Sequence, residues 1–261
     1  MNKQNRIGII GYGYLGRSLH ESLAGTRVDV VSIYNRSEDK LTGLPESIAT
    51  TDMRVFMDTV ADLDLIVELA HPDISKDWGE NILKTTNYMP CSVAALANED
   101  LKFRLLKTAT ASATKLFVPH GAVVGIDNLY EARDNWQDVT ITFRKPPGAI
   151  DMEEEPDGDE TILFEGSVRE IAEKFPRNVN AMVACALATV GPDVALARMI
   201  ADRRLDNVLR GEFEFKGKDG SRLSIIKEEP AVGVSSPGMI TSILGSVLRA
   251  LQQSSEGINF V

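Results

Sequence analysis

The stretch that decides the fold is IGIIGYGYLG, residues 7–16, near the start of the 261-residue chain. An apolar run leads into Gly-x-Gly-x-x-Gly, and a helical pattern over about residues 15–23 follows it. In this context Gly11 permits a tight turn, Gly13 lets a pyrophosphate approach the backbone, and Gly16 allows close packing of helix on strand. The amides at the helix N-terminus would face the phosphates. The sequence therefore predicts a dinucleotide-binding turn made by Gly11, Tyr12, Gly13, Tyr14, Leu15 and Gly16.

The end of the next strand decides which dinucleotide is preferred. An acidic residue about twenty positions after the turn would bind the adenine ribose hydroxyls. Here the apolar run 28–34 ends in Asn35-Arg36, so no carboxylate repels a 2′-phosphate and Arg36 can pair with it. These residues favour NADP(H) over NAD(H). The alternative is that Arg36 lies flat over the adenine ring and that either cofactor is accepted.

The first half of the chain alternates short apolar runs with helical patterns. Runs typical of strands are residues 6–10, 28–34, 63–70, 88–93 and 115–118, and helical spacing occurs at 15–23, 74–85 and 98–112. Strands separated by crossover-length segments favour a parallel sheet. We therefore expect an α/β fold with a Rossmann-type, doubly wound parallel sheet over residues 1–119.

The pattern changes after Pro119. Single strands are expected at 139–144 and 161–166, and a hairpin at 207–216 and 221–227 that turns at 218–220. Residues 120–236 are thus expected to form a second, α+β domain with a more antiparallel sheet. The C-terminal segment 237–261 contains a helix over about 239–253 that is apolar on one face, and we expect it to complete the first domain.

Composition and charge exclude several classes of function. The chain is 43% apolar and 25% charged, and 28 basic against 38 acidic residues give a net charge of −10. This balance argues against binding to nucleic acid or to an anionic membrane surface. The longest uncharged stretch, 230–248, is broken by prolines and glycines and is unlike a transmembrane helix. With no secretory-type apolar segment after residues 1–6, we expect a cytoplasmic protein.

Two cysteines, Cys91 and Cys185, lie in apolar surroundings without a neighbouring Cys or His at the spacing of metal ligands. They are typical of reduced core thiols rather than of a disulfide framework. No metal site is expected.

Several segments, spread nearly from end to end, resemble the L-aspartate dehydrogenase family, in particular its animal aspartate dehydrogenase domain-containing members. They are residues 10–19, 34–36, 64–72, 121–122, 144–147, 163–166, 175–180 and 238–251. The glycine turn is widespread among dehydrogenases, whereas Pro-Arg-Asn-Val-Asn at 176–180, followed by a helix of small residues, is much more restricted.

The resemblance implies an enzyme that interconverts L-aspartate with oxaloacetate and ammonia through an imine, with hydride passing between the α-carbon and nicotinamide C4. It implies that residues 120–236 bind this small acidic amino or imino acid and form a homodimer. It also implies an acid/base histidine late in the chain. In the register fixed by Asp202, Leu205 and Gly217, that position holds Leu209, and residues 121–261 contain no histidine. Either another group transfers the proton or the reaction differs.

Two residues are catalytic candidates to replace the missing histidine. His120 lies where the chain enters the second domain, and an imidazole titrates near neutral pH. The alternative for His120 is a hinge residue that hydrogen-bonds to backbone. Lys145 is the second candidate, because burial beside other cations would lower its pKa toward neutrality.

Other residues are candidates to contact cofactor or substrate. Ala70 and His71 end an apolar run at the rim where α/β sheets bind ligands, so they either contact the cofactor or form a turn. Substrate carboxylates require cations, and amides can bind the nicotinamide or the substrate. The substrate-binding candidates are Arg144, Arg177, Asn178 and Asn180. Charged residues at strand ends are usually solvated, but Arg144 and Lys145 stand before Pro146 in an extended, preset backbone.

Two functions therefore compete. The first is a working NADP(H)-dependent dehydrogenase or imine reductase for a small acidic amino or imino acid, with His120 or Lys145 as proton carrier. The second is a nearly inactive nucleotide-binding protein that kept the cofactor site and lost the chemistry. The cations and amides of the second domain favour the first, and Leu209 favours the second.

Overall fold

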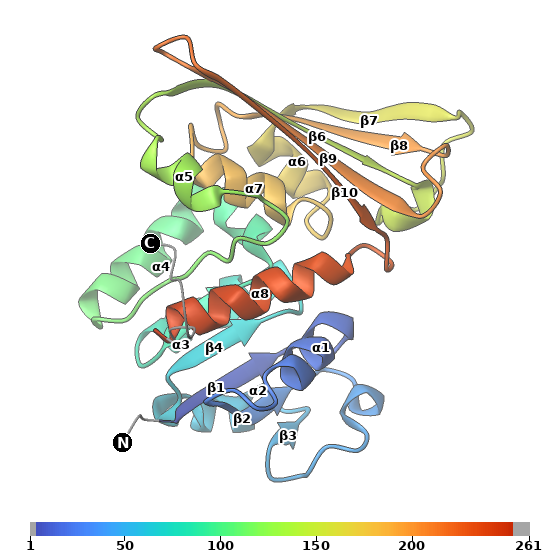
Figure 1. The fold of residues 1–261 in the computed structure, drawn as a ribbon. Helices are drawn as coiled ribbons and strands as arrows, with labels where there is room; N and C mark the ends of the chain where they lie inside the picture. Colours follow the sequence, from blue (N-terminus) through green and yellow to red (C-terminus); the bar gives the residue numbers. More distant parts are fainter. Residues whose placement is uncertain (1–3, 253–261) are drawn as a thin grey trace. The chain divides into compact units, whose positions relative to one another are not determined.

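The computed structural model describes residues 4–252, which form two compact units (Figure 1). Within that range, the first unit contains residues 4–92, 99–119 and 240–252. The second unit contains residues 93–98 and 120–239. Each unit is built around one five-stranded sheet.

The sheet of the first unit is parallel, as the sequence predicts, with strand order β3-β2-β1-β4-β5. Its strands are β1 (Asn5–Ile10), β2 (Val28–Tyr34), β3 (Ala49–Thr50), β4 (Leu65–Glu68) and β5 (Asn87–Pro90). Ile7, Ile9 and Ile10 of the central strand have no exposed surface. Such apolar strands are typical of a sheet that is covered on both faces.

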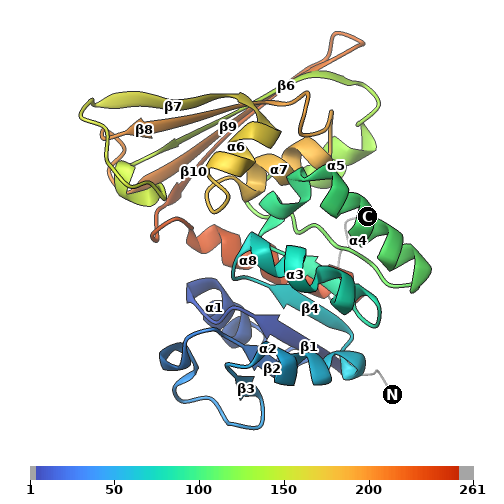
Figure 2. The same cartoon turned by 180° about the vertical axis from the view of Figure 1, so that it is seen from behind.

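Helices cover both faces of this sheet because its two crossovers run in opposite directions. The helices are α1 (Tyr14–Ser22), α2 (Met53–Asp58), α3 (Pro72–Leu83), α4 (Glu99–Ala111) and α8 (Pro237–Ala250), with 3₁₀ turns η1 (Glu38–Leu41) and η2 (Val60–Asp62). The β1–α1–β2 and β4–α3–β5 connections lead to opposite edges, and right-handed crossovers then place α1 and α3 on opposite faces (Figure 2). Helix α8 buries Ile243 and Val247 in this unit.

The sheet of the second unit is mixed, with strand order β10-β9-β6-β8-β7. Its strands are β6 (Trp136–Lys145), β7 (Glu160–Ser167), β8 (Leu196–Asp202), β9 (Val208–Gly217) and β10 (Arg222–Pro230). Only the β6–β8 pair among these neighbours is parallel. The expected hairpin is confirmed as β9 and β10.

One face of this second sheet packs on helices. They are α5 (Ile126–Glu131), α6 (Val168–Lys174) and α7 (Asn180–Leu187), with 3₁₀ turns η3 (Val93–Ala97) and η4 (Pro147–Ala149) (Figures 1 and 2). Helix α6 begins with a capping box, in which Ser167 and Glu170 satisfy each other's backbone amides. Ile141 and Phe213 are buried on the helix-facing side, whereas Ile162 and Ile226 are 57% and 58% exposed on the other side.

The structure differs from the expected strands in three places. Residues 115–118 form no strand, only an isolated bridge between Leu116 and Tyr88. The run 63–70 shortens to Leu65–Glu68, because Glu68 turns its side chain back to bind the loop that follows. Strand β8 was not expected, because its small and charged residues, LARMIAD, lack a clear apolar run.

The described residues, 4–252, bear on membrane-spanning helices, on the cysteines and on metal sites. No helix there is long and apolar enough to span a membrane. Cys185 is buried, Cys91 is half-buried, and both are free thiols. No cluster of three or more His, Cys, Asp or Glu side chains in the same range could hold a metal ion.

Candidate functional site

The glycine turn after β1 is closed at two of its glycines and open at the third. Gly11 has a φ of +96°, and a Cβ there would lie 2.8 Å from the backbone nitrogen of Ala70. A Cβ on Gly16 would collide with the carbonyl oxygen of Gly11. At Gly13, the N-cap of α1, a Cβ would meet no described atom within 4 Å. The backbone is therefore accessible where a dinucleotide pyrophosphate would approach, and the residues present fit that group.

The side chains of the turn point in different directions. Tyr12 is 5% exposed, and its hydroxyl lies 2.8 Å from Nδ1 of His20 on α1. The Arg17 guanidinium stacks over the Tyr12 ring, and burial lowers the pKa of His20. Tyr14 is 44% exposed and Leu15 is half-buried. Tyr12 and His20 thus form a packing pair, and the accessible part of the turn is Gly13 with Tyr14.

The strand end that follows the turn separates the tasks of Asn35 and Arg36. The Asn35 side chain accepts a hydrogen bond from the Tyr12 amide at 2.9 Å and donates one to the Ser37 carbonyl, also at 2.9 Å. Asn35 therefore holds the glycine turn in place. Arg36 is exposed and has no ion-pair partner among residues 4–252. Its charge is accessible to an anion.

The loop after β4 carries the candidates Ala70 and His71. His71 is the N-cap of α3, and its Nδ1 accepts a hydrogen bond from the Asp73 amide at 3.3 Å. The Asp73 carboxylate also lies 3.1 Å from this nitrogen. The turn-forming task of His71 is therefore present in the structure. Ala70 packs against Gly11 at the back of the turn.

A buried carboxylate that the sequence analysis did not single out is that of Glu68, at the end of β4. Its carboxylate is fully buried and accepts hydrogen bonds from the amides of Ala70, His71 and Ser92 and from the Ser92 hydroxyl. Burial raises the pKa of Glu68 to about 7, against the lowering effect of these hydrogen bonds. The signal was present in the sequence, because a carboxylate that ends an apolar strand must find partners.

In the second unit, Lys145 and Asn178 form one buried cluster. Lys145 is 5% exposed, and its Nζ donates to the Asn178 carbonyl at 3.2 Å. The Asn178 side chain donates a hydrogen bond from Nδ2 to the Ala149 carbonyl and accepts one at Oδ1 from the Asp151 backbone amide. Burial lowers the pKa of Lys145 to about 8. Lys145 is thus a buried amine with a lowered pKa, and Asn178 fixes the loop around it.

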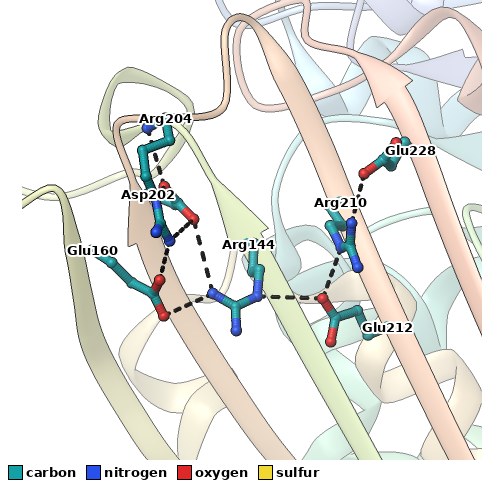
Figure 3. Close-up of polar contacts among 7 residues, drawn as sticks. All are labelled: Arg144, Glu160, Asp202, Arg204, Arg210, Glu212 and Glu228. Atoms are coloured by element: carbon teal, nitrogen blue, oxygen red, sulfur yellow. Dashed lines mark hydrogen bonds and ion pairs between the residues drawn. The ribbon is translucent and has the colours of Figure 1, made fainter.

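Arg144 lies on the opposite face of β6 from Lys145, because adjacent residues of a strand alternate. Its guanidinium contacts Glu160 at 2.8 Å, Glu212 at 3.3 Å and Asp202 at 3.8 Å. Hydrogen bonding to Glu160 raises the pKa of Arg144 and lowers that of Glu160. Figure 3 shows Arg144 between these acids, with a network that also includes Arg204, Arg210 and Glu228. The structure brings Arg144 together with carboxylates and not with Lys145.

Arg177 and Asn180 lie on either side of Asn178 in the sequence. The Arg177 side chain is 52% exposed and pairs with Asp151 at 3.3 Å. The Asn180 Oδ1 accepts a hydrogen bond from the Ala94 amide of η3 at 2.9 Å. Its Nδ2 group has no hydrogen-bond partner in the described part of the chain. Arg177 therefore keeps an accessible charge, and Asn180 keeps a free donor.

His120 is half-buried and begins the long segment of the second unit. Its carbonyl accepts the Val123 amide at 3.1 Å, and the next residue, Gly121, has a φ of +57°. His120 thus lies in a tight turn.

Leu209, at which the sequence analysis expects the family's histidine position, lies in β9 between two ionisable residues. Glu229 of β10 pairs with Leu209 directly. On the other side Arg144 pairs with Arg210, so the next residue, Lys145, lies beside Leu209 in the same antiparallel register. Lys145, Leu209 and Glu229 therefore form a row across three strands on one face of the sheet.

Family models match both halves of the chain, and relatives match most of its length. A model of the NAD-binding domain of homoserine dehydrogenase matches residues 11–119, and a model of the aspartate dehydrogenase C-terminal domain matches residues 127–254. An L-aspartate dehydrogenase from Methanosarcina mazei is 32% identical over 241 residues, which cover 87% of this chain and 89% of the relative. The chain belongs to the L-aspartate dehydrogenase family. It is accordingly an oxidoreductase with a nicotinamide-binding domain.

Other members and solved structures agree with this assignment. An aspartate dehydrogenase domain-containing protein from Xenopus tropicalis is 29% identical over 265 residues, which cover 92% of this chain and 91% of the relative. The crystal structure of aspartate dehydrogenase from Thermotoga maritima matches with a TM-score of 0.76 at 26% identity, covering 98% of this chain and 99% of that one. The predicted resemblance and the α/β fold class are both confirmed.

Proposed function

We propose that this member of the L-aspartate dehydrogenase family is an NADP(H)-preferring dehydrogenase or imine reductase for a small acidic amino or imino acid. The observation that carries the cofactor preference is the pair Asn35-Arg36. Asn35 is occupied in holding the turn, whereas Arg36 is exposed beside it without an acidic partner among residues 4–252. The substrate class rests on the relatives named L-aspartate dehydrogenase.

Each end of the cofactor would be held by a different part of the chain. The open backbone at Gly13 and the N-terminal amides of α1 would bind the pyrophosphate. Arg36 would pair with the 2′-phosphate, and Ala70 and His71 would lie along the cofactor at the sheet edge. When bound, the nicotinamide supplies the hydride acceptor or donor for the substrate α-carbon.

The second unit would supply substrate binding and proton transfer. Arg177 offers an accessible cation for a substrate carboxylate, and the Nδ2 group of Asn180 offers a donor for the substrate or the nicotinamide amide. Lys145 would accept the proton released when the substrate amine becomes an imine, since its pKa of about 8 leaves part of it neutral near neutral pH. His120 is the alternative carrier. We keep Asn178 as a residue that positions Lys145.

Arg144 fits a structural task better than a substrate-binding one. Three carboxylates already surround its guanidinium, and it points away from the face that carries Lys145. A substrate carboxylate would have to displace Glu160 or Glu212. Substitution of Arg144 distinguishes this structural task from substrate binding.

We also propose a cytosolic homodimer whose interface includes the exposed face of the second sheet. Large apolar side chains are exposed on that face and would be covered in such a dimer. They are Ile162, Leu196 and Ile226. Light scattering should give twice the chain mass of 28.5 kDa. A single-chain mass at micromolar concentration would contradict the dimer.

A second candidate function is favoured by Leu209. Leucine transfers no proton, so a chain that lost the histidine without replacement would bind NADP(H) and react very slowly. Fluorescence titration with NADPH and NADH, followed by steady-state assays with L-aspartate, separates these functions. Cofactor binding without turnover on any small acidic amino or imino acid supports the nucleotide-binding alternative.

A further inference from the structure

Glu68 occupies a special place at the carboxyl edge of the first sheet. It ends β4, pairs in register with Ile10 of β1, and pairs on its other side with Pro90 of β5. Ile10 immediately precedes Gly11, so Glu68 lies beside the start of the glycine turn. Its side chain has no exposed surface.

One carboxylate there joins two loops. Glu68 Oε1 accepts hydrogen bonds from the amides of Ala70 at 2.6 Å and His71 at 2.8 Å, and from the Ser92 hydroxyl at 2.9 Å. Glu68 Oε2 accepts the Ser92 amide at 3.1 Å. No cation pairs with Glu68 among residues 4–252, so these donors alone compensate its burial.

The loop that Glu68 holds also packs against the backbone of Gly11. A Cβ on Gly11 would lie 2.8 Å from both the Leu69 carbonyl carbon and the Ala70 nitrogen. A movement of this loop would therefore change the space behind the turn. We propose that Glu68 is a positioning residue for the nicotinamide cofactor, which sets the shape of the glycine turn by holding residues 69–71 and Ser92. This proposal rests on the binding of a nicotinamide cofactor given under Proposed function.

Protonation offers a specific signature of this task. A proton on Glu68 would stand among groups that are already donors, and only the Ser92 hydroxyl can reverse its hydrogen bond to accept it. The titratable side chains that interact with Glu68 are Tyr88 on β5 and Cys91 after β5, and His71 contacts Glu68 through its backbone amide. Burial raises the pKa of both Tyr88 and Cys91, so near neutral pH these two stay uncharged. Cofactor affinity should therefore rise as the pH increases through about 7.

The test is a fluorescence titration of the full chain with NADPH between pH 5.5 and 8.5. Glu68→Gln keeps an oxygen for the Oε1 partners but places an NH₂ group against the Ser92 amide. It should weaken NADPH binding at pH 8 by about tenfold and remove the pH dependence. Ser92→Ala removes one hydrogen bond and keeps the carboxylate, so it should weaken binding by about two- to threefold and retain the pH dependence.

Two control variants separate positioning from general loss of stability and from histidine titration. Thr86 is buried just before β5, at the amino-terminal end of the strands, and its hydroxyl donates to the carbonyls of Val60 and Leu63. Thr86→Val should lower the thermal midpoint and leave NADPH affinity unchanged. His71→Asn keeps an N-cap residue and should retain the pH dependence.

The outcomes distinguish this proposal from the proposed function. Wild-type protein that binds neither NADPH nor NADH contradicts both. Wild-type binding with an unchanged affinity and pH profile in Glu68→Gln overturns only the positioning task, as does a pH dependence that disappears in His71→Asn. If Glu68→Gln fails to fold, Ser92→Ala decides, because wild-type affinity in that variant overturns the proposal.

Discussion

Each unit of the molecule buries one carboxylate or amine side chain that has no ion-pair partner in the described residues, Glu68 in the first and Lys145 in the second, and their hydrogen bonding differs greatly. Glu68 of the first unit accepts four hydrogen bonds. Lys145 of the second unit has a single hydrogen bond, from its amine to a backbone carbonyl, and lies over the Phe143 ring. A saturated carboxylate holds its surroundings in place, whereas an amine with one acceptor is available to exchange a proton. This difference is the reason we propose positioning for Glu68 and proton transfer for Lys145.

The largest expected effect is on turnover in Lys145→Met. General acid/base catalysis contributes about 10²- to 10⁴-fold, so turnover should fall by that order while NADPH affinity stays within a few-fold. Steady-state kinetics with cofactor titration provide the measurement. His120→Ala is the matched variant, and a loss confined to His120→Ala would transfer the proton-carrying task to His120.

The next effect is on stability, and the two groups should act with opposite sign. Glu68 has a raised pKa, so the folded state binds the extra proton and the free energy of unfolding falls as pH rises through about 7. Lys145 has a lowered pKa, so it destabilises the fold below about pH 8 and this cost disappears at higher pH. Each contribution is about 3 kcal/mol. The measurement is denaturant unfolding between pH 5 and 10. Glu68→Gln should remove the fall in the free energy of unfolding through about pH 7, and Lys145→Met should remove its rise above about pH 8.

A smaller effect is expected on cofactor choice. Arg36→Asp places a carboxylate where the 2′-phosphate would lie and should narrow or invert the preference for NADPH over NADH by about 1 to 3 kcal/mol. Parallel titrations with both cofactors give the value. A clear NADH preference in the wild-type protein would show that Arg36 does not bind a phosphate.

The smallest effect is expected from Arg144→Gln. Its partners lie on a partly exposed face, where ion pairs contribute about 1 kcal/mol or less. The thermal midpoint should drop slightly, and KM for the substrate should not change. A KM increase of 100-fold or more would restore Arg144 as a substrate-binding residue.

The sequence predicted what depends on local patterns. The glycine turn and the strand Val28–Tyr34 follow from residue type and spacing alone, and both are present. The separation of Arg144 from Lys145 could also have been predicted, because adjacent strand residues point to opposite faces. The acids around Arg144 could not, since Glu160, Asp202 and Glu212 come from three strands whose pairing is set by the tertiary fold.

The remaining parts of the site depend on side chains that meet across loops. Asn35 holds the turn through the Tyr12 amide, 23 residues away in the chain. Glu68 meets Ser92 across 24 residues. Neither pairing has a sequence motif, although an acid at the end of a buried strand indicates that such partners exist.

The most direct test of the account is the initial rate of NADPH formation from NADP⁺ and L-aspartate, measured side by side for wild-type protein and Lys145→Met. Because residues 121–261 contain no histidine to serve as the family's acid/base group, we predict a slow wild-type rate, below about 1 per second, that Lys145→Met reduces by at least about a hundredfold. A wild-type rate that Lys145→Met leaves unchanged would contradict the assignment of proton transfer to this buried lysine.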